Sequence, residues 1–229
     1  MVNSVVQQSM LRRAVEQEKV ELHCVNLRDF GKGNYRQIDD KPFGGAVGMV
    51  MMAKPLFQAI DSAIELVGGS KNLRVIYPSP QGELWSHKHA VENSKVDKLI
   101  VICGHYKGID ERVIEKYVTH EYSIGDFVVT SGELPALIVI DSVVRLVPGV
   151  LNKIESALSD TFSSDLLDTP YYTHPREIEG IKVPDVLLSG HHEKIEEWRK
   201  NSSEEVTRKK RPDIWKKYLE LNDLEKNNE

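Results

Sequence analysis

Residues 98–108, KLIVICGHYKG, pass from an apolar, β-branched run into a loop of glycine and polar residues. Such a run predicts a buried strand that ends just before the first glycine. Other short runs share this composition. The predicted strands are residues 20–25, 73–77, 98–103 and 127–130.

Two segments between these runs have the spacing of helices. Residues 54–67 place apolar side chains on one face and stop at Gly68, and glycine often ends a helix. Residues 133–147 carry Pro135 in the first turn and stop at Pro148. Strands that alternate with helices predict an α/β domain with a mostly parallel sheet covered on both faces.

After Pro148 the sequence changes in character. Residues 152–164 are small and polar without a clear period, which indicates a linker. Residues 193–200 and 212–221 then show short helical patterns. We therefore expect an α/β domain over residues 1–150, a linker over 151–166 and a small helical domain over 167–229.

The composition is typical of a globular protein with a sizeable core: 40% hydrophobic and 28% charged residues. Cys24 and Cys103 lie far apart in the sequence, so neither a disulfide framework nor a zinc knuckle is expected. The first twenty residues are polar, and Asp141 and Arg145 interrupt the longest apolar stretch. We therefore expect no signal peptide, no membrane contact and a cytoplasmic location.

The net charge is −5, but the positive charges are unevenly placed. Between positions 199 and 217, eight basic residues outnumber three acidic ones. This basic cluster consists of Arg199, Lys200, Arg208, Lys209, Lys210, Arg211, Lys216 and Lys217. It is a candidate contact for a polyanion, and a solvated helix face is the alternative interpretation.

Three loops rich in glycine and small polar residues accompany the predicted strands, at residues 77–82, at 104–108, and at 123–126 together with 131–133. In a parallel sheet, loops that follow the carboxyl ends of strands gather at one edge, where ligands bind. Glycine lets the backbone approach a ligand, and free backbone groups can hydrogen-bond an adenine edge. Together the loops predict a nucleotide-like ligand.

Two common phosphate-binding motifs are absent from the sequence. No G-x-G-x-x-G follows a strand, and there is no G-x-x-x-x-G-K-[ST]. Residues 44–48, GGAVG, follow a polar segment, so we expect a mobile loop or lid there. A dinucleotide or a triphosphate has no obvious pyrophosphate cradle.

Six motifs, in this order along nearly the whole chain, closely resemble those of the bacterial tRNA (guanine-N1-)-methyltransferase family, TrmD. They are DDKPFGG at 39–45, YPSPQG at 77–82, CGHYKGIDERV at 103–113, SIGDFVVTSGELP at 123–135, IDSVVR at 140–145 and LLSG at 187–190. The resemblance implies a SPOUT-type fold with a trefoil knot in the C-terminal part of the α/β domain. It also implies an obligate homodimer with active sites at the interface, S-adenosyl-L-methionine bound in the knot, and methylation of N1 of the guanosine 3′ of the anticodon in the tRNA anticodon stem-loop.

The same resemblance assigns roles to individual residues. Asp160 would be the general base, and Arg145 the cation beside guanine O6. The cofactor would contact Tyr77, Pro78, Ser79, Pro80, Gly104, Tyr106, Gly108, Ile124, Gly125, Asp126, Phe127, Val128, Val129, Gly132 and Pro135. The tRNA would contact Asp168, Ser189, Gly190, Arg199, Arg208, Lys209, Lys210 and Arg211.

The chain departs from the usual family pattern in several places. Five replacements are His105 and His174 for arginine, Lys107 for glutamate, and Ala46 and Ser131 for glycine. Lys107 reverses a charge inside a predicted ligand loop. Family members usually begin with a short apolar strand that is missing before Val2, so we expect a sheet with one strand fewer.

Simpler interpretations of the site residues remain open. Asp160 could cap a helix or lie in a turn, and Arg145 could pair with Asp141, four residues earlier on one helix. Asp168 is the second candidate for the base, although its position before Thr169 is more typical of a turn.

Two alternatives concern the protein as a whole. One is another S-adenosylmethionine-dependent RNA methyltransferase of the same fold, and the other is a non-catalytic RNA- or nucleotide-binding protein. Two histidine pairs lack the spacing of a known metal site, so no metal is predicted. These pairs are His87 with His89 and His191 with His192.

Overall fold

The structure is a computed structural model that describes residues 1–151, 161–162 and 165–226. The chain divides into two compact units, Met1–Ile154 and Glu155–Glu229. Asp160 and most of the predicted linker lie outside the described residues.

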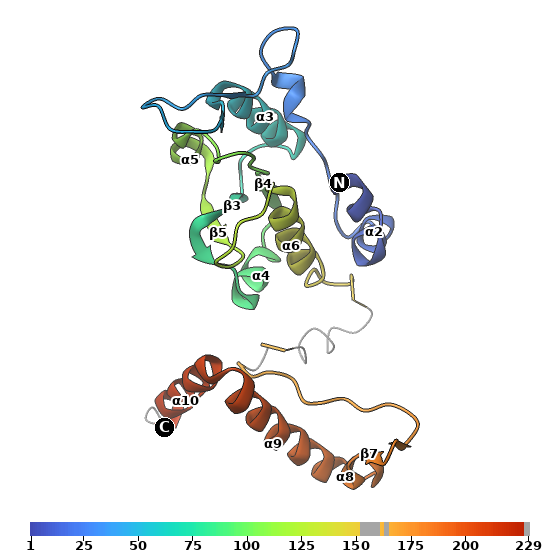
Figure 1. The fold of residues 1–229 in the computed structure, drawn as a ribbon. Helices are drawn as coiled ribbons and strands as arrows, with labels where there is room; N and C mark the ends of the chain where they lie inside the picture. The colour runs from blue at the N-terminus through green and yellow to red at the C-terminus, as the bar shows by residue number, and fades with distance from the viewer. Residues whose placement is uncertain (152–160, 163–164, 227–229) are drawn as a thin grey trace. The chain divides into compact units, whose positions relative to one another are not determined.

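A parallel three-stranded sheet forms the centre of the first unit (Figure 1). Its strands are β3 (Leu73–Leu84), β4 (Lys98–Val101) and β5 (His120–Ser123), with β3 between the other two. The predicted mostly parallel sheet is confirmed. The register of β3 with β5 shifts between Pro78 and Glu83, so the loop predicted at 77–82 is instead an irregular continuation of the strand.

Two of the predicted strands are wrong. Residues 20–25 have no regular secondary structure, and residues 127–130 form bends and irregular chain without a strand. A strand is stabilised by neighbours that pack on its side chains, and Val128 in the second run is 88% exposed. The third strand of the sheet, β5, has the polar sequence HEYS and escaped prediction, although its Tyr122 is buried.

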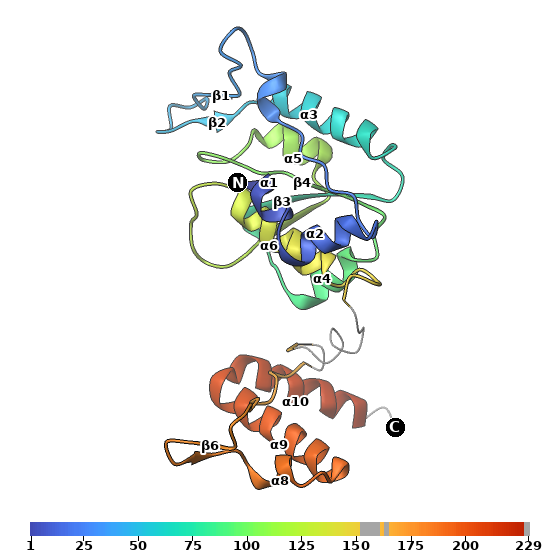
Figure 2. The same cartoon turned by 90° about the vertical axis from the view of Figure 1, so that its right-hand side faces the viewer.

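Helices cover both faces of the sheet (Figures 1 and 2). Successive side chains of a strand point to opposite faces. Val75 and Tyr77 therefore pack on one face with α3 (Ala53–Leu66) and α5 (Glu111–Tyr117). Ile76, between them, packs on the other face with Val139 of α6. Helices α3 and α6 (Glu133–Val144) confirm the two helices predicted in this region.

Shorter elements complete the first unit. They are α1 (Val2–Val6), α2 (Ser9–Glu16), the 3₁₀ helix η1 (Leu27–Phe30), the antiparallel pair β1 (Asp39–Asp40) and β2 (Val50–Met51), and α4 (His87–Asn93). Leu11 and Ala14 of α2 are buried in a small core with Val144 and Val150, next to the end of α6.

The second unit contains a hairpin, β6 (Glu177–Ile178) with β7 (Ile181–Lys182), and the helices α8 (Asp185–Leu188), α9 (His192–Lys210) and α10 (Pro212–Lys226). Helix α9 is longer than the predicted 193–200. Its second half is polar, but Thr207 is fully buried and its Oγ1 accepts a hydrogen bond from the Leu167 N–H (2.9 Å). That contact stabilises the second half of α9, which has no apolar periodicity by which it could be predicted.

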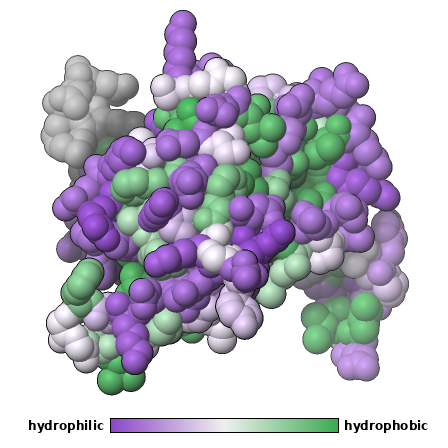
Figure 3. Space-filling model, turned by 90° about the horizontal axis from the view of Figure 1, so that it is seen from above, coloured by the Kyte–Doolittle hydropathy of each residue, from purple (hydrophilic) through white to green (hydrophobic). Residues whose placement is uncertain are grey.

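Hydrophilic side chains dominate the face seen in Figure 3, with hydrophobic ones in separate spots. None of the helices in the described part of the chain combines the length and the hydrophobicity of a membrane span.

Candidate active site

Two of the predicted ligand loops touch each other at the carboxyl end of the sheet. The Gly132 N–H donates a hydrogen bond to the Gly104 carbonyl (2.7 Å), and His105 pairs with Ser131 as an antiparallel bridge. A Cβ added at Gly132 would lie 2.4 Å from the backbone nitrogen of Gly104. Only glycine allows the chain segments to cross this closely.

Tyr77 joins β3 to the same loops. Its side chain lies so close to Gly104 that a Cβ there would be 3.0 Å from the Tyr77 hydroxyl, and one at Gly108 would be 3.3 Å from it. Burial, and secondly the charge of Glu121, raise the pKa of Tyr77. The hydroxyl therefore stays protonated at neutral pH.

The loop after β5 exposes apolar side chains. It turns at Gly125, whose φ of 135° is unfavourable for other residues, and Gly125 N–H donates to Ser123 Oγ (3.2 Å). Phe127 is 56% exposed and Val128 even more so. Tyr106 in the neighbouring loop is also exposed, with a positive φ. These side chains offer apolar surface to a ring-shaped ligand.

Glu133 is a candidate site residue that sequence reasoning missed. Its Oε1 lies 2.8 Å from His105 Nε2, while Oε2 is buried without a hydrogen-bond partner among the described residues. Desolvation opposes ionisation, but hydrogen bonds from Ser131 and His105 outweigh it and lower the pKa of Glu133. The signal in the sequence was an acidic residue directly after the loop glycine, at the first turn of a helix.

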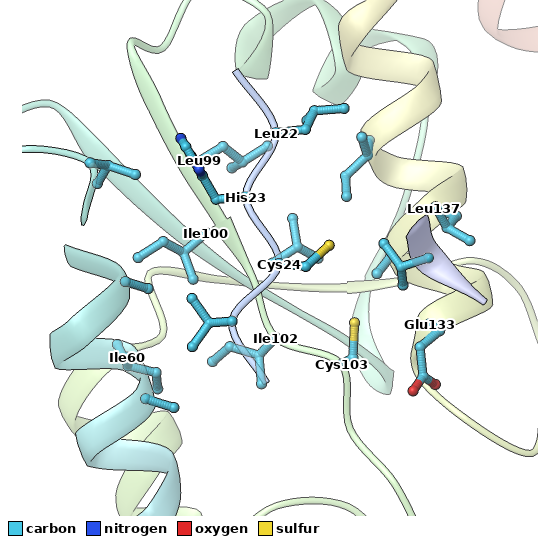
Figure 4. A pocket seen from close by; sticks show the side chains of 18 of the residues that line it. Leu22, His23, Cys24, Ile60, Leu99, Ile100, Ile102, Cys103, Glu133 and Leu137 are labelled. Atoms are coloured by element: carbon cyan, nitrogen blue, oxygen red, sulfur yellow. The ribbon is translucent and has the colours of Figure 1, made fainter. Parts of the chain in front are cut away.

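A buried acceptor that lacks a donor costs free energy, so Oε2 is well suited to accept a hydrogen bond from a ligand N–H or to face a positive charge. Glu133 and Cys103 lie close to the same end of a large cavity (Figure 4). Glu133 is therefore the strongest candidate for an anionic group at this edge of the sheet.

The lowered pKa of Glu133 predicts a pH dependence of stability. A carboxyl group with a depressed folded pKa stabilises the protein above its unfolded pKa, and that contribution is lost as the pH falls through the folded value. Wild type should therefore lose melting temperature relative to Glu133→Gln as the pH drops below about 4.3. Thermal unfolding of both proteins between roughly pH 3 and 6 checks this, and parallel curves would contradict it.

Residues 49–51, directly after the glycine-rich segment 44–48, are hydrogen-bonded to the ligand loop at 104–108. The Lys107 N–H donates to the Met49 carbonyl (3.1 Å), and the Met51 N–H donates to the Gly108 carbonyl (3.0 Å). Phe43 and Val47 are 100% and 85% exposed. The segment predicted as a lid thus emerges beside the ligand loops.

Arg145 lies at the other end of helix α6 from Glu133. Its backbone N–H donates to the Asp141 carbonyl (3.2 Å) at the carboxyl cap. Twelve residues at about 1.5 Å each separate the two positions by roughly 18 Å. Within one copy of the chain, Arg145 therefore lies far along α6 from Glu133 and from the crossing of Gly132 with Gly104.

Only one of the two candidate bases, Asp168, lies among the described residues. Asp160 lies outside the described residues. Asp168 accepts hydrogen bonds from the Thr169 N–H (2.7 Å) and the Tyr171 hydroxyl (2.8 Å). Both carboxylate oxygens of Asp168 are therefore engaged locally, as expected of a turn residue.

The remaining residues predicted to bind the cofactor differ in their exposure to solvent and in their hydrogen bonds. Asp126 is exposed, Ile124 and Val129 are half-buried, and Pro135 is buried in the first turn of α6. Ser79 donates a short hydrogen bond to Glu121, and its Oγ accepts from the Gln81 N–H (3.0 Å). Because Pro135 is buried in the first turn of α6, it shapes the start of that helix.

Comparison with known proteins identifies the family of the chain. The sequence model of the family described as tRNA (Guanine-1)-methyltransferase TrmD matches residues 1–217. The chain belongs to this family. It is 47% identical over 215 residues to the tRNA (guanine-N(1)-)-methyltransferase of Clostridioides difficile (strain 630), covering 94% of this chain and 93% of the relative. Enzymes of the same name from Bacillus pumilus (48% over 214 residues, 93% of this chain and 87% of the relative) and Burkholderia vietnamiensis (50% over 204 residues, 88% and 77%) are similarly close.

The second unit of this TrmD family member carries the basic cluster on its surface. Within the described residues, five cluster members form ion pairs: Arg199–Glu196 (2.7 Å), Lys209–Glu205 (2.6 Å), Arg211–Asp213 (2.6 Å), Lys216–Glu220 (3.9 Å) and Lys217–Asp165 (3.9 Å). Exposed pairs of this kind contribute only about 0–1 kcal/mol. They leave the basic side chains available to phosphate groups.

Ser189 and Gly190 lie at the junction of α8 and α9. Ser189 Oγ donates to the Val186 carbonyl (2.7 Å) and accepts from the His191 N–H (3.2 Å), while Gly190 has a φ of 72°. Over residues 1–151, 161–162 and 165–226, no group of three or more His, Cys, Asp or Glu side chains is arranged to hold a metal ion. His89 instead contacts Glu83 (3.2 Å) and Ser86.

Proposed function

We propose that this protein transfers a methyl group from S-adenosyl-L-methionine to N1 of the guanosine 3′ of the tRNA anticodon, in the cytoplasm. The observation that carries the proposal is the close crossing of glycine-rich loops at one edge of a parallel sheet, in a chain that belongs to the TrmD family. Ligands of α/β proteins bind at this edge.

The residues present fit an adenosine-containing methyl donor. The glycines near Tyr77 let the backbone approach an adenine ring closely, and Phe127 offers an exposed apolar face. The buried Glu133 Oε2 lacks a donor among described atoms, and an ammonium or sulfonium group would complement it. When bound, S-adenosyl-L-methionine would supply an electrophilic methyl group.

The acceptor nitrogen needs help from the protein. Guanine N1 carries a proton at neutral pH, and an amide-like N–H lies about five pKa units above an ordinary carboxyl group, which is roughly 7 kcal/mol uphill. A nearby cation on O6 and desolvation of the carboxylate both reduce this difference. We assign removal of the N1 proton to Asp160, with Asp168 as the second candidate for this base. We assign the cation beside O6 to Arg145.

The separation of Arg145 from the crossing of Gly132 with Gly104 supports a homodimer. If one copy supplies the crossing of Gly132 with Gly104 and another supplies Arg145, the distance along α6 ceases to be an obstacle. Helix α6 also exposes Leu134 (44%) and Ile138 (48%) one turn apart, an apolar stripe that a second copy would cover. The contact between Gly132 and Gly104 supports the trefoil knot that the family resemblance implies.

We assign tRNA binding to the second unit, and we keep the predicted division at residues 150 and 166. Phosphate contacts by the basic cluster and by Ser189 and Gly190 would position the RNA. The target guanine would leave its stack to reach the methyl donor.

Neutralising part of the basic cluster should weaken tRNA binding. Lys200, Arg208 and Lys210 are exposed and form no ion pair with a described residue. Their joint replacement by glutamine should raise KM for tRNA with little change in kcat. The slope of log affinity against log salt concentration should also become less steep, by about 0.7–0.9 for each RNA phosphate that the variant no longer neutralises. The matched control replaces Lys54, Lys88 and Lys95 of the first unit. Equal effects in both variants would contradict the assignment.

A methyl-transfer assay tests the proposed function. Labelled S-adenosyl-L-methionine and unmodified tRNA transcripts should yield labelled RNA, and a transcript with adenosine in place of the guanosine 3′ of the anticodon should stay unlabelled. Label in that control would favour another RNA methyltransferase. Without any transfer, a rise in melting temperature with S-adenosylhomocysteine, worth about 2.7 kcal/mol at 100 times its Kd, would favour a non-catalytic binding protein.

A further inference from the structure

The chain between Leu167 and Tyr172 is tied along helix α9 of the second unit. The Leu167 N–H donates to Thr207 Oγ1 (2.9 Å), and the Leu167 carbonyl accepts a hydrogen bond from Ser203 Oγ. At the other end of the segment, the ring of Tyr172 packs against that of Trp198, with centroids 6.4 Å apart. The segment therefore follows α9 from Thr207 back to Trp198.

Tyr171 presents an aromatic ring to solvent from this segment. It is 73% exposed, whereas Tyr172 is 47% exposed. The Tyr171 hydroxyl donates to Asp168 Oδ2 (2.8 Å), and Asp168 Oδ1 accepts from the Thr169 N–H (2.7 Å). The ring is thus restrained by a carboxylate that the backbone itself holds in place. A ring restrained before binding loses little conformational entropy when a ligand covers it.

The surroundings of the segment favour a nucleobase as the ligand of this ring. The hydrogen bonds of Leu167 tie the segment to the last turns of α9, which lead into a run of exposed basic side chains. This run consists of Arg208, Lys209, Lys210 and Arg211. A single-stranded loop of RNA carries phosphate groups and aromatic bases side by side, and unpaired bases stack on exposed aromatic side chains. A basic run and a restrained, exposed ring in one part of the second unit match that combination.

We propose that Tyr171 stacks on an unpaired base of the tRNA anticodon loop, and that Asp168 is the positioning residue that orients the ring. This contact rests on the proposed function, because it requires tRNA as the substrate. It gives Asp168 a role in substrate binding for which it need not act as the base. Stacking needs only an aromatic face, so the contact secures the loop without reading the base through hydrogen bonds.

The affinity of the full chain for unmodified tRNA transcripts tests the stacking contact. Tyr171→Leu should raise the Kd by about 5- to 100-fold, which corresponds to the loss of one stacked base. The slope of log Kd against log salt concentration should stay as in wild type, because no phosphate contact is lost. The matched control is Tyr35→Leu. Tyr35 is 93% exposed in the first unit, and its replacement should leave the Kd unchanged.

Tyr171→Phe separates the ring from its hydroxyl. It keeps the aromatic face and should retain most of the affinity that Tyr171→Leu loses. If Asp168 acts through the Tyr171 hydroxyl, Asp168→Asn should raise the Kd no further in a protein that already carries Tyr171→Phe. A Kd for Tyr171→Phe as high as that for Tyr171→Leu would overturn the stacking contact, and additive effects of Asp168→Asn and Tyr171→Phe would overturn the positioning role.

Transcripts that lack one base at a time identify the stacked nucleotide. At one position of the anticodon loop, an abasic transcript should bind wild type as weakly as the intact transcript binds Tyr171→Leu. Removal of both partners should then cost no more affinity than removal of either one.

The remaining outcomes distinguish this contact from the proposed function. If wild type methylates tRNA but Tyr171→Leu binds it equally well, or loses affinity additively with every abasic position, the contact is wrong and the function stands. Dissociation of the Tyr171→Leu homodimer in sedimentation would assign the ring to a second copy of the chain instead. A wild-type protein that neither binds nor methylates tRNA would overturn the proposed function, and the stacking contact with it.

Discussion

Asp160→Asn is expected to reduce methyl transfer to tRNA by at least ~10²–10⁴-fold. Asparagine keeps the size of the side chain but cannot take the N1 proton of guanine. The affinity for S-adenosylhomocysteine should stay nearly unchanged, because the proposed cofactor contacts come from the loops around Tyr77, Gly104 and Gly125. Single-turnover assays and calorimetric titration of the same protein measure the two properties.

The matched control for this prediction is Asp168→Asn. Both oxygens of Asp168 accept local hydrogen bonds, so its replacement should cost some stability in the second unit and leave the rate of methyl transfer within about tenfold. The reverse result, with Asp168→Asn inactive and Asp160→Asn active, would transfer the role of the base to Asp168.

Gly132→Ala is expected to cost about 3 kcal/mol or more of folding stability, or to abolish cofactor binding if the chain still folds. The added Cβ would lie 2.4 Å from Gly104 N and 2.8 Å from Gly104 O. Both are backbone atoms inside a paired crossing, so neither can rotate away as a flexible side chain would. Denaturant unfolding and titration with S-adenosylhomocysteine measure the two effects.

Gly45→Ala is the control for the glycine substitution. Nothing lies within 4 Å of a Cβ at Gly45, although its φ of 77° is unfavourable for alanine. Its expected cost is only about 1–2 kcal/mol, from backbone strain. Similar destabilisation in both variants would mean that strain, and not the crossing, explains the effect at Gly132.

The sequence predicted most of the fold where local pattern and tertiary packing agree. Helices α3 and α6 were readable because apolar spacing and terminal glycine or proline coincide. Strand β5 was not, because its residues HEYS carry no apolar run and it forms by pairing with β3. Residues 20–25 have the composition of a strand but no paired neighbour among the described strands, and strand propensity depends on such neighbours.

Predictions for the site divide in the same way. The glycine-rich loops could be found from sequence, because close backbone approach leaves glycine at fixed positions. The role of Glu133 could not, because it arises from a hydrogen bond to His105 and a buried oxygen that only the folded chain creates. Arg145 and Asp160 were assigned by family resemblance, and we propose that a second copy of the chain brings them to the site.

Hybrid dimers test most directly whether one active site is built from two copies. Gly125→Val should disable the cofactor loop, because a β-branched residue is strained at its φ of 135°, and Asp160→Ala should disable the base. Each variant alone should be inactive. Suppose that the loop of one copy works with Asp160 of the other. Random exchange of equal amounts then makes half of the dimers hybrids, and each hybrid has one intact site of two. The mixture should therefore regain about one quarter of wild-type activity. Mixtures that stay inactive after verified subunit exchange would contradict the shared site.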